Sequence, residues 1–116
     1  WAKVRCVGKY RHTHYWRVKD ASLSIRRQYR MLEEQLHGKP WTTEEDALAF
    51  LTDAGLVGRL TMAKEGRWPS GDEAMLSSKI GECVWWLAVL AERNGVDFAA
   101  AVEDFLQMRA AQLQDS

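Results

Sequence analysis

The sequence has few of the residues and motifs that identify a familiar active site. It holds only two cysteines, Cys6 and Cys83, and they form no C-x-x-C pair. Cys83 stands in an apolar segment, where a free thiol behaves as a small hydrophobic side chain. G-x-x-x-x-G-K, G-x-G-x-x-G and H-E-x-x-H are absent from the sequence. With so few candidate bases, nucleophilic chemistry of the Ser–His–Asp or Cys–His type is not indicated.

Long apolar runs are also missing. The run from Val84 to Ala91 is too short to cross a bilayer, and no secretory signal pattern occurs. We therefore expect a cytoplasmic protein that has no membrane partner.

Acidic residues are scarce in the first 30 positions and basic residues are in the minority after them, although the formal net charge of the 116 residues is zero. Residues 1–30 carry nine Lys or Arg and one acid, whereas residues 31–116 carry seven Lys or Arg and fifteen acids. This asymmetry predicts a basic N-terminal segment that contacts an acidic surface of the same protein or of a partner. A chain this small buries only about 65% of its unfolded surface, so we expect a homo-oligomer, either a dimer or a tetramer.

Hydrophobic periodicity predicts four helices, over residues 21–36, 42–63, 72–94 and 97–112. Thr42 and Glu45 have the spacing of a capping box, Gly95 suits a helix C-terminus, and Asp97 can cap the last helix. Residues 1–20 show no helical period, and we expect a basic arm that is irregular or a hairpin. The expected organisation is this arm followed by an all-α bundle over residues 21–116.

Two phrases in the helical part resemble a known family. They are "TTEEDALAFLTDAGLVGRL", and "GECVWWLAVLAERNGVDFAAAVEDFLQMRAAQL" further on. The order of a glycine, an acid, a tryptophan pair and the ending "LAERNGVD" is similar to the MazG-like, all-α nucleoside triphosphate pyrophosphohydrolases. The resemblance covers about residues 42–112. It implies a helical bundle that is built by pairing subunits, with nucleotide as the substrate class and Mg²⁺ as the cofactor.

The family's metal site consists of two acids three residues apart on each of two helices, and only half of it is present here. Asp53 and Glu82 keep an acid at two of the four positions and are the candidate metal ligands. Leu56 and Lys79 stand at the other two. Residues three apart share a helix face, so we expect the Lys79 ammonium to take the place of the metal between Asp53 and Glu82.

Two functions remain open at this stage. The first is a divergent nucleotide-related protein of pyrophosphohydrolase ancestry with a degraded metal site, and whether it is an active enzyme is left open. The alternative is a non-catalytic dimeric interaction module whose basic N-terminal arm binds a protein or a nucleic acid. Arg11, Arg17 and Arg67 are the candidate contacts to phosphate or to a polyanion.

Overall fold

The computed structural model describes residues 2–68 and 71–114, with the side chains of residues 2–14 and of His37 outside that description. It consists of α1 (Ala2–His37), α2 (Thr43–Lys64), the short 3-10 helix η1 (Glu73–Met75), α3 (Leu76–Arg93) and α4 (Phe98–Gln114). The described residues include no strand, which confirms the all-α fold class and the four α-helices.

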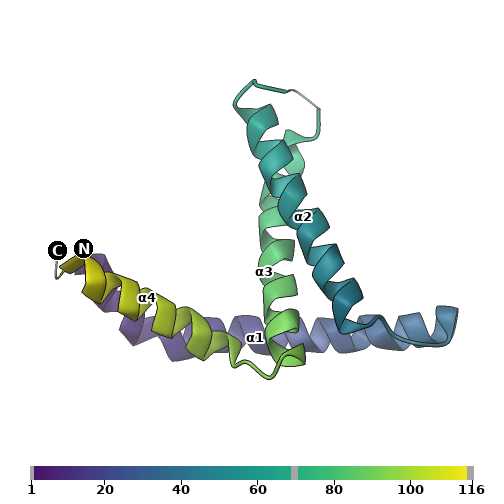
Figure 1. Cartoon of the computed structure of the whole chain (residues 1–116), viewed down its shortest axis with the longest axis horizontal. Helices are drawn as coiled ribbons and strands as arrows, with labels where there is room; N and C mark the ends of the chain where they lie inside the picture. The colour runs from purple at the N-terminus through teal and green to yellow at the C-terminus, as the bar shows by residue number, and fades with distance from the viewer. Residues whose placement is uncertain (1, 69–70, 115–116) are drawn as a thin grey trace.

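The four helices form two antiparallel pairs (Figure 1). Helix α4 returns beside the N-terminal half of α1, and α2 and α3 form a hairpin that stands across α1. The first of these pairs is long and the second projects from it, so the molecule measures 52 × 39 × 21 Å. One cluster of polar side chains lies between α2 and α3, and a second lies where this hairpin meets α1.

The expected irregular or hairpin arm over residues 1–20 is not confirmed. The backbone of α1 is one continuous helix from Ala2, so no helix boundary falls at residue 21. A single glycine such as Gly8 costs a helix only about 1 kcal/mol. Contact with α4 along the helix can outweigh both this cost and the low propensity of the aromatic and β-branched residues.

The expected start of α2, end of α3 and start of α4 are confirmed, whereas α3 begins at Leu76 after η1 and not at residue 72. At the start of α2, Glu45 N donates to Thr42 Oγ1 (3.2 Å) and Thr42 N donates to Glu45 Oε1 (2.9 Å), which completes the capping box. Gly95 has a φ of 70°, as a helix-ending glycine requires. Asp97 caps α4, because its Oδ1 accepts from Ala100 N at 3.0 Å.

The apolar faces of α1 and α2 point away from the rest of the chain. The helical spacing of Leu48, Leu51, Gly55 and Val57 or Gly58 favours a buried face on α2, but Leu48 and Leu51 are 63% and 62% exposed. The expected stripe on α1 is likewise exposed at Ile25, Tyr29, Leu32 and Leu36. Among the described residues, the buried hydrophobic side chains come from the second half of α2, from α3 and from the start of α4. They are Leu60, Ala63, Trp86, Ala88, Val89, Phe98 and Ala99.

Polar side chains occupy the inward faces instead. Ser22 and Arg26 of α1 and Asp46 and Asp53 of α2 are all buried. A helix normally turns its apolar face to the core and its polar face to water. In α1 and in the first half of α2, the inward face carries these polar side chains instead, while the second half of α2 buries Leu60 and Ala63.

Among residues 2–68 and 71–114, one stretch, Glu73–Arg93, is long and apolar enough to cross a membrane by length and composition. It shares this property with the core helices of soluble proteins, and it assigns no location by itself.

Candidate functional site

Asp53, Lys79 and Glu82 meet between α2 and α3. Lys79 Nζ donates to Glu82 Oε1 at 3.0 Å, one turn further along α3, and to Asp53 Oδ1 of α2 at 3.4 Å. The antiparallel packing of α2 against α3 brings these residues together although Asp53 lies far from the other two in sequence. The ammonium thus stands between the two carboxylates, as we expected from the resemblance.

The second oxygen of Asp53 is also engaged. Trp86 Nε1 donates to Asp53 Oδ2 at 3.0 Å, and both residues are buried. A buried carboxylate is stable only when it is paired and hydrogen-bonded, and Asp53 has one such partner on each oxygen. Trp86 therefore holds Asp53 in place within the core.

The cluster favours a charged lysine. The hydrogen bond to Glu82 raises the pKa of Lys79 above its usual 10.5, helped by the charge of Asp53, while burial opposes the rise. Burial, together with the charges of Asp53 and Glu82, raises the pKa of the neighbouring Cys83 thiol. Lys79 therefore stays protonated at neutral pH, and Cys83 stays a thiol.

These residues do not suit a magnesium ion. Mg²⁺ needs oxygen ligands at about 2.0–2.1 Å in near-octahedral geometry. Two carboxylates that already share an ammonium leave one net negative charge, and the cation occupies the space between them. Among residues 2–68 and 71–114, no group of three His, Cys, Asp or Glu side chains is placed to hold a metal.

The other expected site residues lie apart from this cluster. Leu56, one turn beyond Asp53, is 37% exposed and offers no ligand atom. Arg67 is exposed in the turn after α2, and Arg17 is exposed on α1. Neither arginine contacts Asp53, Lys79 or Glu82 in the described part of the chain. The side chain of Arg11 lies outside the described residues.

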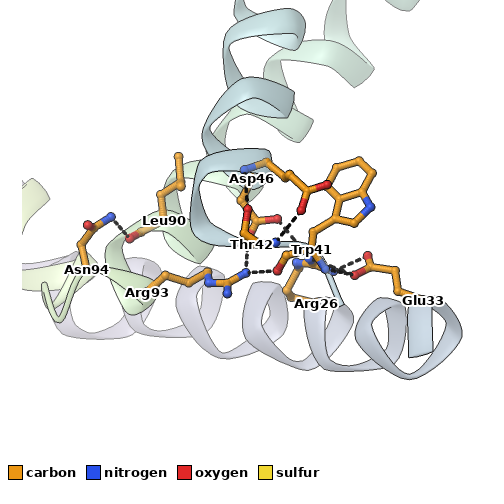
Figure 2. A network of polar contacts seen from close by, with 9 residues as sticks. Arg26, Glu33, Trp41, Thr42, Asp46, Leu90, Arg93 and Asn94 are labelled. Carbon is orange, nitrogen blue, oxygen red and sulfur yellow. Dashed lines mark hydrogen bonds and ion pairs between the residues drawn. The ribbon is translucent and has the colours of Figure 1, made fainter. Parts of the chain in front are cut away.

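A second polar network, which the sequence analysis did not identify, joins three helices (Figure 2). Asp46 of α2 is fully buried, and its two oxygens accept from Arg26 Nη2 of α1 at 3.0 Å and from Arg93 Nη1 of α3 at 2.7 Å. Arg26 also donates to Glu33 at 2.8 Å. Glu33 Oε1 in turn accepts from Trp41 N at 2.9 Å, which ties the loop between α1 and α2 to α1.

The charges in this network stabilise one another. Burial would lower the pKa of Arg26, but hydrogen bonds and charges from Glu33 and Asp46 outweigh it and raise this pKa. Burial would raise the pKa of Glu33, but its hydrogen bonds to Arg26 and Trp41 N bring this pKa below its usual 4.5. Arg26 and Glu33 therefore each favour the charged form within the fold.

Trp86 connects the two networks. Its indole N–H binds Asp53, while its ring lies 5.9 Å from the Arg26 guanidinium carbon and stacks on Trp41 at a centroid distance of 6.3 Å. A continuous path of polar and aromatic contacts thus runs from Lys79 to Arg93 through the middle of the molecule.

The sequence did contain a signal for the second network. Ser22, Arg26, Arg30 and Glu33 follow one another at spacings of four, four and three residues, which puts them on one face of α1. Two adjacent arginines such as Arg26 and Arg27 are typical of a solvated face, but Arg26 is 3% exposed. The apolar residues on another side of α1 form a more conspicuous pattern than these polar ones, so the sequence favours burial of the wrong face.

We compared the chain with protein-family models, with curated proteins and with solved structures, and none matched.

Proposed function

We propose that this protein is a non-catalytic, self-associating helical interaction module. It is a divergent, MazG-like protein of the cytoplasm in which an internal ammonium replaces the metal of a nucleotide-hydrolysing ancestor. The observation that carries the proposal is the Asp53–Lys79–Glu82 cluster. Its two carboxylates bind the ammonium, and the remaining oxygen of Asp53 binds Trp86.

The exposed apolar faces support self-association. On α2 the positions 48, 51, 55, 58 and 62 follow the alternating three- and four-residue spacing of a coiled-coil seam. Open space surrounds the positions that side chains would take at Gly55 and Gly58, so a second helix can approach closely there. On α3, Ile80, Val84 and Leu87 form a second exposed stripe.

A second copy of the α2–α3 hairpin is the occupant that suits these seams. Two hairpins complete a four-helix bundle, in which each apolar face is covered by the same face of the partner. This gives a homodimer, or a tetramer if two dimers associate.

The basic N-terminal half of α1 is the surface that we propose for an outside partner. Six of the sixteen Lys and Arg residues fall within positions 1–19, with no acid among them. Arg17 is exposed on this helix. A partner with an acidic surface or a nucleic acid backbone complements this charge.

Magnesium-dependent hydrolysis of nucleoside triphosphates is the second candidate function. It is favoured by one observation, that Asp53 and Glu82 lie within reach of a single cation. We expect the unmodified protein to release no pyrophosphate from a nucleoside triphosphate in the presence of Mg²⁺, because one net negative charge is too little to strip water from that ion.

The test restores the two lost acids. Leu56→Glu combined with Lys79→Glu creates a group of four carboxylates, and calorimetry should then detect Mg²⁺ binding that the unmodified protein lacks. Without metal the double variant should melt at a lower temperature, because four like charges repel. Met108→Glu with Lys64→Glu makes the same charge change away from this cluster and should bind no Mg²⁺. Turnover of a nucleotide by the unmodified protein would contradict the non-catalytic proposal.

A further inference from the structure

A small cavity between α1 and α3 is lined mainly by arginines. Its volume is about 200 Å³, and Arg26, Arg27, Arg30 and Arg93 line it together with Glu92. Pockets for drug-sized ligands measure about 300–1,000 Å³, whereas a water molecule needs only about 10–15 Å³ by this kind of measure. The cavity therefore has room for a small ion with some of its water.

The positive charges in this cavity are only partly neutralised. Asp46 and Glu33 bind Arg26, and Asp46 also binds Arg93. Arg30, by contrast, makes no hydrogen bond or ion pair with any described residue. With Glu92 included, four guanidinium groups face three carboxylates, so the cluster keeps one positive charge in excess.

Two of the arginines that line the cavity each have a buried Nε–H group without an acceptor among the described residues. They are Arg26 and Arg30. The two side chains lie one turn apart on α1, and Arg26 is 3% exposed. Burial and the nearby charges of Arg93 and Arg26 lower the pKa of Arg30, and they outweigh the charges of Asp46 and Glu33, which raise it. A buried donor that lacks an acceptor, next to like charges, is the environment that a bound anion would relieve.

From this geometry we propose that the cavity is a binding site for one phosphate group. A phosphate carries up to two negative charges, which offset the positive excess, and several strong acceptor oxygens for the guanidinium groups that line the cavity. Arginine is suited to this role because its planar fork of donors fits phosphate oxygens. The size of the cavity limits the ligand to inorganic phosphate or to the phosphate of a larger molecule whose remainder stays outside. This inference is independent of the proposed self-association and of the Asp53–Lys79–Glu82 cluster.

The first experiment follows the arginine Nε–H signals of the ¹⁵N-labelled full chain by NMR. Inorganic phosphate is titrated at pH 7.5 with ionic strength held constant by sodium chloride. We expect saturable shifts of the Arg26 and Arg30 signals, and weaker binding at pH 5.5, where phosphate has lost one charge. The absence of saturable shifts, or equal shifts with chloride alone, would overturn the proposal.

The second experiment uses a matched pair of variants. Arg30→Gln should weaken phosphate binding by roughly tenfold or more, the effect of losing one charged hydrogen bond. Arg109→Gln on α4 removes the same charge away from the cavity and should bind as the unmodified protein does. Arg30→Gln should stay folded by circular dichroism, since Arg30 pairs with no described side chain. Unchanged binding by Arg30→Gln would contradict the assignment of the site.

A third titration identifies the source of the phosphate. If a nucleoside monophosphate binds no more tightly than inorganic phosphate and shifts the same arginine signals, the ligand is free phosphate. If it binds more tightly and also shifts Leu23 and Val89, which line the cavity, the ligand is an organic phosphate. If phosphate shifts the signals of exposed arginines such as Arg67 and leaves Arg26 and Arg30 unchanged, the cavity is not the site.

Discussion

Asp46 is the residue on which the junction of α1, α2 and α3 depends. It has no exposed surface, and it is the shared partner of two arginines from two other helices. A buried ion pair adds little compared with a well-packed apolar core, but removing one partner leaves a buried charge without compensation. The network therefore specifies how the helices meet, and its loss is costly.

The first residue-scale prediction concerns Asp46→Asn. We expect this variant to lower the free energy of unfolding by about 3 kcal/mol, because Arg26 and Arg93 each lose their charged hydrogen bond to Asp46 and Arg26 keeps only Glu33 as an ion-pair partner among the described residues. Asp104→Asn on the exposed side of α4 is the matched control and should change the free energy by less than about 0.5 kcal/mol. Urea denaturation at pH 7 measures both. If the two variants lower the free energy of unfolding equally, the junction of α1, α2 and α3 does not depend on Asp46.

The second residue-scale prediction is a pH dependence that originates at Glu33. Its pKa in the fold is below the usual 4.5, so its contribution to stability is present above that value and is lost as the pH falls through the lowered pKa. Glu33→Gln should therefore cost about 1–2 kcal/mol at pH 7, and the difference from the unmodified protein should shrink below about pH 4.

Glu34→Gln is the control for this pH dependence, because Glu34 is the neighbouring carboxylate and is exposed. It should follow the unmodified protein at every pH. A Glu33→Gln effect of constant size from pH 7 to pH 3 would show that the charge of Glu33 is not responsible.

At the scale of single helices, α2 has two faces that serve different neighbours. One face contributes Asp46, Asp53, Leu60 and Ala63 to the interior of the chain. The other presents Leu48 and Leu51, followed by two glycines, to the outside. A long exposed apolar face on a small protein indicates an interaction surface.

The element-scale prediction tests that outer face of α2. Light scattering should give a mass of at least twice the 13.3 kDa of one chain for the unmodified protein. Leu48→Lys with Leu51→Lys should shift the protein to the monomer, because charges at the seam cannot be buried without partners. Met108→Lys, on the exposed surface of α4, should leave the mass unchanged. A monomeric unmodified protein at micromolar concentration would contradict the shared bundle.

At the scale of the whole molecule, the chain is extended and its charge is separated. Its radius of gyration is 17.0 Å, whereas a compact domain of this length has about 13 Å. The two helix pairs cross instead of packing into one compact unit (Figure 1), so a single chain leaves much apolar surface uncovered. The basic residues gather in the first 30 positions, at the N-terminal side of α1.

The whole-molecule prediction concerns this basic segment. Arg11→Gln with Arg17→Gln should weaken retention on heparin and make the binding of a polyanion less steeply dependent on salt, since fewer counterions are released. Substitution is preferable to deletion, because residues 2–20 belong to α1 and removing them would also remove the surface that α4 contacts. Arg67→Gln with Arg109→Gln is the control of equal charge. If both pairs of changes act alike, the N-terminal segment has no special role.

The sequence by itself determined the local features of this protein. Capping residues such as Thr42 and Asp97 and the left-handed position of Gly95 act within one helical turn, so the ends of the later helices followed from neighbouring residues. The three-residue spacing of Lys79 and Glu82 likewise puts both on one face of α3, where Lys79 Nζ bonds to Glu82.

Only the tertiary structure decided which face of each helix is buried. An apolar stripe shows that a helix face prefers to be covered, but the pattern is the same whether the cover is the same chain or a second copy. Asp46 could be buried because Arg26 and Arg93 arrive from two other helices, and no local spacing reports that meeting. The inward polar face of α1 and the arginine-lined cavity follow from this long-range arrangement.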